Sequence, residues 1–119
     1  MKRLLVLLSL FLSFALQSQQ IIPLNEKSYI DSLQNITKGT HPDTSKATAS
    51  FLLSNYYRNS DSVLSKKYLA KGKILAQNNP FISAKYYYYE GQYNLDRNKK
   101  KAAASYQQAI QSLSKFKNE

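Results

Sequence analysis

From Pro23 onward, apolar residues recur with the spacing of an α-helix, and no segment alternates as a β-strand would. Asn25 can cap a first helix, and Gly39 is placed to end it. A loop at 40–44 and short polar breaks at 59–61, 78–80 and 96–98 separate the rest. The sequence therefore predicts an all-α chain of five helices, of which the second begins near Ser45.

Two of the predicted helix pairs repeat one another with a period of 37 residues. Tyr56 and Tyr93 stand late in the first helix of each pair, and Gly72 and Ala109 stand midway along the second helix, at the same separation. A fixed period of this size indicates stacked helix pairs, and a small residue allows two helix backbones to approach closely. The pattern predicts a leading helix and loop, followed by two helix pairs packed side by side. The expected bounds are 19–44, 45–79 and 80–119.

The second pair resembles the tetratricopeptide repeat. The residues that match the spacing of that family are Tyr93, Ala102, Tyr106, Ala109 and Ile110, with the usual glycine displaced to Gly91. In the first pair, Tyr56 and Gly72 fit the same spacing, and the period exceeds the usual one of about 34 residues. The resemblance covers residues 45–116. It implies an α-α superhelix (a solenoid) of about two helix pairs after one preceding helix.

In tetratricopeptide repeat proteins, the first helix of each pair lines a concave groove that holds a ligand. Carried over by register, this implies a partner-binding groove formed by Ser50, Ser54, Tyr57, Arg58, Tyr87, Gly91, Asn94 and Leu95. The resemblance also implies that the repeats pack through Tyr56, Gly72, Tyr93, Ala102, Tyr106 and Ala109. Tyrosine and arginine are favoured at binding hot spots. The alternative is a solvated face that holds no ligand.

Four consecutive tyrosines, at positions 86–89, form the most distinctive feature of the sequence. Tyr86, Tyr89 and Tyr93 fall on the apolar stripe of their helix, which predicts that they belong to the core. Tyr87 and Tyr88 point away from that stripe.

The N-terminal segment has the layout of a secretory signal peptide. Lys2 and Arg3 precede an apolar run over residues 4–16, interrupted only by two serines. A helix of that length measures roughly 20 Å, against about 30 Å of bilayer hydrocarbon. We therefore expect residues 1–18 to be removed after Ser18 and the chain to reach the periplasm or cell envelope, with a retained anchor as the alternative. The absence of cysteine excludes a lipoprotein anchor and disulfides.

The layout also resembles the beginning of bacterial signalling proteins of the Bacteroidetes type. In those proteins a signal peptide and tetratricopeptide repeats precede a membrane helix and a histidine kinase or helix-turn-helix regulator. Residues 43–46 and 56–61 carry this resemblance. It implies a sensing or scaffolding role in the envelope. Any kinase or other activity, and any membrane attachment, would lie in C-terminal parts that this chain lacks.

No arrangement of residues in the sequence predicts catalysis. His41 is the only histidine, and the three glycines do not form a phosphate-binding loop, so no metal, cofactor or small-molecule substrate is expected. The formal charge is +10, from 17 basic and 7 acidic residues, but the lysines are scattered along the helices, and we expect no nucleic-acid binding. The expected partner is a protein or peptide, and an acidic one would fit this charge. The alternative is a structural spacer or self-association unit with no separate ligand.

Overall fold

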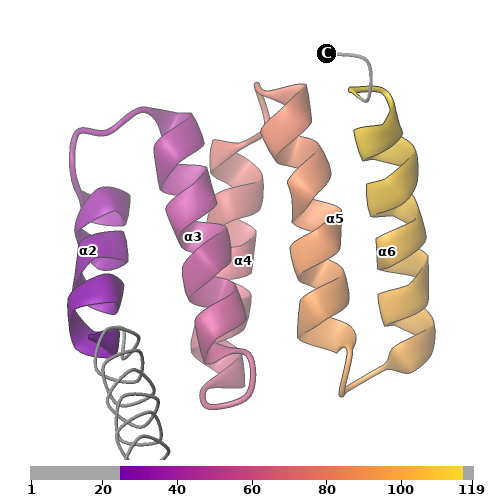
Figure 1. Cartoon of the computed structure of the whole chain (residues 1–119), viewed down its shortest axis with the longest axis horizontal. Coiled ribbons are helices and arrows are strands. Elements are labelled where there is room, and N and C mark those ends of the chain that lie inside the picture. The colour runs from indigo at the N-terminus through magenta and orange to yellow at the C-terminus, as the bar shows by residue number, and fades with distance from the viewer. Residues whose placement is uncertain (1–24, 117–119) are drawn as a thin grey trace, which may run out of the picture.

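The computed structural model describes residues 25–116, which form five α-helices. These helices are α2 (Glu26–Lys38), α3 (Asp43–Tyr57), α4 (Ser62–Leu75), α5 (Pro80–Asn94) and α6 (Lys99–Ser114). Neighbouring helices run antiparallel, and α4 lies behind α3 and α5 (Figure 1). The all-α prediction is confirmed for this part of the chain. The predicted signal peptide lies outside the described residues.

Short polar side chains begin four of the five helices. The side-chain oxygen of each cap accepts a hydrogen bond from the backbone N–H three residues later, as expected of an N-cap. The caps are Asn25, Asp61, Asn79 and Asn98. The exception is α3, which starts at Asp43 and not near Ser45 as predicted. Pro42 already has a φ of −57°, which is compatible with a first helical turn, and the Asp43 carboxylate favours the positive end of the helix dipole.

The core consists of two clusters that meet along α3. Ile30 and Leu33 of α2 pack against Ala49 and Leu53 of α3 in the first cluster. In the second cluster, Phe51 of α3 packs with apolar side chains of α4 and with tyrosines of α5. Because α3 contacts α2, α4 and α5, it is the central helix of the described fold.

The predicted close helix contact at Gly72 is present, but it lies within one helix pair. A Cβ atom built on Gly72 would come within 2.5 Å of the Phe51 ring, so the glycine of α4 leaves room for an aromatic side chain of α3. A similar contact joins α5 and α6, where a Cβ on Gly91 would come within 2.6 Å of the Tyr106 ring. The contact that Gly72 allows is therefore with the other helix of its own pair.

The tyrosines of α5 divide much as the sequence predicts. Tyr86, Tyr89 and Tyr93 pack against the second core cluster, although each is only partly buried. The Tyr89 ring stacks on Phe51 with 5.2 Å between centroids. Tyr88 is exposed, whereas Tyr87 is half-buried.

The helices at the two ends of the described fold have fewer neighbours than the helices between them. Helix α5 contacts α3 and α4 in addition to α6. Within residues 25–116, α2 packs mainly against α3, with one hydrogen bond from the Lys71 ammonium of α4 to the Thr37 carbonyl, and α6 packs only against α5. Each end helix therefore has a side that no described helix covers. None of the described helices has both the length and the apolar character needed to cross a bilayer.

Candidate functional site

Half of the predicted groove is buried. The buried members are Ser50, Ser54, Gly91 and Asn94. Ser54 meets Ser65 of α4, whose hydroxyl donates to the Ser54 carbonyl at 2.6 Å. The hydroxyl of Ser50 and the amide of Asn94 donate to carbonyls one turn earlier in their own helices. These four residues are not available to a ligand in this arrangement, so their assignment to a groove is corrected.

The other four predicted groove residues do not form one surface. Tyr57 is half-buried and stacks on Tyr68, with ring centroids 6.1 Å apart. Tyr87 lines a shallow hollow between α5 and α6. Arg58 and Leu95 do lie near each other, because the Arg58 guanidinium donates to the carbonyl of Gln92, which is three residues before Leu95. The structure therefore brings together only this pair.

Five of the six predicted packing residues are buried or half-buried. Four are buried or half-buried between α5 and its neighbours or within a pair, namely Tyr93, Ala102, Tyr106 and Ala109. Gly72 is buried under Phe51. Tyr56 is exposed, and its hydroxyl donates to Glu26 of α2 at 3.4 Å.

A line of exposed apolar side chains on α5 was missed by sequence reasoning. Phe81, Tyr88 and Leu95 are 42%, 42% and 39% exposed. They are seven residues apart, which is two helical turns, so they share one side of the helix. Between them lies Lys85, whose Nζ sits 4.7 Å from the centre of the Phe81 ring.

Side chains of α6 continue this surface. The Tyr106 hydroxyl donates to the Gln92 side chain, and the Gln92 amide donates to the Tyr88 hydroxyl at 3.2 Å. Ile110 of α6 is 69% exposed. We call the surface formed by Phe81, Tyr88, Leu95, Tyr106 and Ile110 the end face, because it belongs to the last described helix pair.

The Tyr106 hydroxyl of the end face stays protonated at physiological pH. Burial raises the pKa of Tyr106, the neighbouring Tyr88 raises it further, and the nearby Arg58 lowers it. The phenol therefore remains protonated and can donate to Gln92. The tyrosine and glutamine side chains form a hydrogen-bonded polar strip across an otherwise apolar surface.

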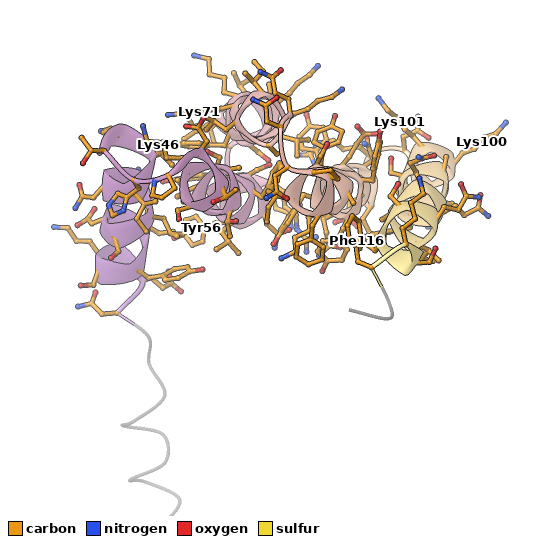
Figure 2. All side chains as sticks on the ribbon, turned by 90° about the horizontal axis from the view of Figure 1, so that it is seen from above. Lys46, Tyr56, Lys71, Lys100, Lys101 and Phe116 are labelled. Carbon is orange, nitrogen blue, oxygen red and sulfur yellow. The ribbon has the colours of Figure 1, made fainter. Side chains whose placement is uncertain are left out.

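Several lysines lie on the side of the molecule that faces away from Tyr56 and Phe116. Figure 2 shows Lys71, Lys100 and Lys101 on the side away from Tyr56 and Phe116. Helix α4 contains four lysines and no acidic residue, and α6 begins with three lysines and likewise contains no acid. The positive charge of the described chain is therefore concentrated on α4 and α6.

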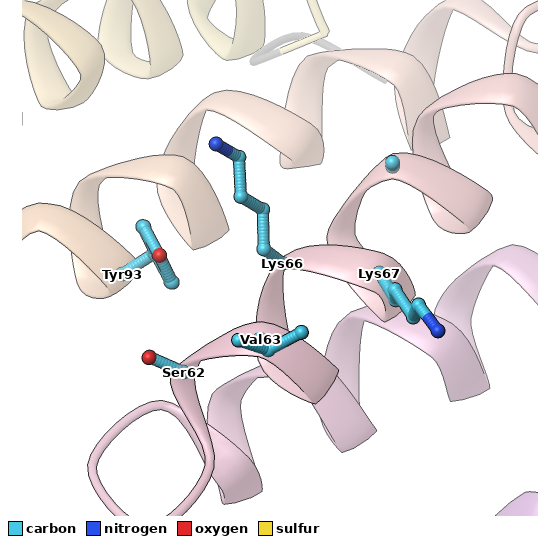
Figure 3. A pocket seen from close by; sticks show the side chains of 6 residues that line it. Ser62, Val63, Lys66, Lys67 and Tyr93 are labelled. Carbon is cyan, nitrogen blue, oxygen red and sulfur yellow. The ribbon is translucent and has the colours of Figure 1, made fainter.

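An open hollow of about 330 Å³ lies beside α4. Figure 3 shows Lys66 and Lys67 on α4 pointing in different directions, with Tyr93 of α5 across from them. Their charges do not converge on one point, so the hollow does not present a binding arrangement for a single anion. Among the described residues, no three potential metal ligands lie together.

Gly91 is a sequence signal for the misplaced part of the groove, because a small residue within a helix allows a neighbouring helix to approach. In the structure Gly91 lies under the Tyr106 ring. On the same helix Tyr88 and Leu95 are exposed and Asn94 is buried. The small residue thus marks the side of α5 that faces α6.

Comparison with known proteins finds no family model, no curated protein and no solved structure that matches this chain.

Proposed function

We propose that this chain is an exported interaction module that binds a partner protein through the end face. The proposal depends on a difference in polarity between the two ends of the described fold, at α2 and at the last helix pair. The exposed positions of α2 are polar apart from Tyr29, whereas the end face gathers four of the large apolar side chains that are exposed. Clustered exposed apolar residues with aromatic members are typical of protein-binding surfaces.

Two observations support a tetratricopeptide-like stack as the scaffold of this module. The most extensive helix contacts are within α3–α4 and within α5–α6, which is the pairing that such a stack requires. Tyr56 and Tyr93, 37 residues apart, each reach the helix that precedes their own pair. Export to the periplasm or cell envelope rests on the predicted signal peptide, and a sensing or scaffolding role in envelope signalling rests on the resemblance described above.

The second candidate function is self-association, and the same end face favours it. An uncovered apolar surface can pair with its own copy as readily as with another protein. In that case the chain would be a structural spacer with no separate ligand. The chain carries a formal charge of +10, and only Lys2 and Arg3 of its charged residues lie in the predicted signal peptide. The remaining positive charge opposes close approach of two copies, which is why we place this candidate second.

In-cell cross-linking of the tagged, exported protein tests these alternatives. The informative variant is Leu95→Glu with Ile110→Glu, and the matched control is Ile74→Glu. Ile74 is 65% exposed near the C-terminal end of α4, and Ile110 is 69% exposed near the end of α6. We expect the double variant to lose cross-linked partners that the control retains. Recovery of the same proteins by the double variant would refute the assignment, and recovery of copies of the chain alone would favour the spacer.

A further inference from the structure

The way α5 docks on the first helix pair defines a receiving surface. Tyr86 and Tyr89 of α5 pack against Phe51, with ring centroids 6.3 and 5.2 Å away. On α4, the Nζ of Lys73 lies 4.8 Å from the centre of the Tyr86 ring. Arg58 of α3 donates to a backbone carbonyl of α5. A helix with aromatic side chains on one face is thus held by three positions of the preceding pair.

The same three positions recur one period later as exposed residues of the end face. Tyr88, Leu95 and Ile110 stand 37 residues after Phe51, Arg58 and Lys73. Phe51 is 1% exposed because α5 covers it, whereas Tyr88 is 42% exposed. Within residues 25–116, no helix covers the later set. The later set is also more apolar, because leucine and isoleucine replace arginine and lysine.

We propose that the end face receives an amphipathic helix of a partner protein, packed across α5 and α6 as α5 packs across α3 and α4. This inference rests on the proposed function and specifies its partner. The partner helix presents large apolar or aromatic side chains at positions i, i+3 and i+7, which is the spacing of Tyr86, Tyr89 and Tyr93. Residues at that spacing share one helix face, and such anchors are a general mode of helix recognition.

The charge around the end face favours acidic residues on the flanks of that helix. Lys85 lies within the apolar line of α5, with its Nζ 4.7 Å from the centre of the Phe81 ring. Charge complementarity of this kind steers association and rejects partners of like charge. A second copy of this chain fits less well, because its own end face carries the same lysine and the exposed positions of its α2 are mostly polar.

Titration with a synthetic helix tests the proposal directly. The probe has the sequence of residues 80–94 with Lys85→Glu and a fluorescent label, and the control peptide carries serine in place of Tyr86 and Tyr89. We expect the probe to bind the full chain with saturable anisotropy and the control peptide to bind at least about tenfold more weakly, since each lost anchor of 1.4 kcal/mol is a factor of ten.

Variants of the chain locate the bound probe. Ile110→Glu should weaken binding of the probe about tenfold or more, whereas Ile74→Glu should leave it within about twofold. Leu95→Glu serves as the second end-face variant if Ile110→Glu loses helical circular dichroism. Absence of probe binding, or equal binding by the end-face variants and the control variant, overturns the proposal. If cross-linked partners still depend on the end face while the helix does not bind, the interaction function stands and the helical partner is wrong.

Discussion

The two helix pairs differ in which side chains they can bury. The α3–α4 pair encloses Phe51 and Leu53 almost completely, whereas the residues buried in α5–α6 are small or polar, such as Ala84, Ala102 and Ser105. The first pair has α2 on one side and α5 on the other, and the second has a described neighbour on one side only. A large side chain becomes buried when a neighbouring helix covers it. Burial here reflects which helices lie next to a position as much as residue type.

The two pairs also differ in which of their helices supplies the glycine at the close contact. In α3–α4 an aromatic ring of the first helix lies over Gly72 of the second, and in α5–α6 Tyr106 of the second helix lies over Gly91 of the first. The positions equivalent to Gly91 and Ala102 are Ser54 and Ser65, which bond to one another in the buried interior. Equivalent positions are thus a hydrogen-bonded serine pair in α3–α4 and a glycine and an alanine in α5–α6, where the Tyr106 ring lies over the glycine.

The largest expected effect comes from replacing the equivalent aromatic residues of the two pairs with alanine. Phe51→Ala removes a buried ring stacked on Tyr89 and should lower the free energy of unfolding by about 3–5 kcal/mol. Tyr88→Ala, one period later, should lower it by only about 1 kcal/mol, because that side chain is already 42% exposed. Urea unfolding followed by circular dichroism measures both. Equal losses would mean that something covers the end face in the isolated protein.

Substitution of the two glycines should have a smaller and unequal effect. Gly72→Ala gains about 1 kcal/mol of helix propensity but forces a Cβ into the Phe51 ring, which Tyr89 holds in place, for a net loss of about 1–2 kcal/mol. Gly91→Ala forces a Cβ into the half-exposed Tyr106 ring, which can turn outward, so the net change should be near zero. Thermal melts of the two variants provide the measurement. A larger loss for Gly91→Ala would reverse our assignment of which pair is the more constrained.

Alkaline pH should destabilise the contact between the pairs more than the end face. Burial raises the pKa of Tyr86 well above its usual value, and the hydrogen bond with Glu90 raises it further. The folded state therefore keeps this proton when the unfolded chain loses it, so stability is full below about pH 10 and falls as pH rises above it. Melting temperatures recorded across that range should fall less steeply for Tyr86→Phe than for the unchanged protein. Tyr106→Phe should alter the slope less, and the reverse order would contradict the comparison.

Helix number and most helix ends could be predicted from the sequence because they depend on local chemistry. The caps at Asn25 and Asp61 follow from side chains that bond their own backbone, and Asn79 and Asn98 use the same mechanism. Which side of a helix faces outward depends on its neighbours. Phe51 and Tyr88 occupy equivalent positions in sequence, yet one is covered and the other exposed. The spacing of apolar residues predicts that a segment is helical, but it does not predict which helices will cover each of its sides. Half of the predicted groove residues are therefore buried.

Arg97 links the turn after α5 to the end of α3. Its guanidinium donates to the carbonyl of Tyr93 at 2.7 Å and to the carbonyl of Arg58, and it lies 4.4 Å from the centre of the Tyr93 ring. This one side chain fastens the turn after α5 to the last turn of α3. Arg97 therefore adds a contact between α3 and the turn that leads into α6, beyond the packing of the helices themselves. Loss of this side chain would leave that turn without its hydrogen bond to the central helix.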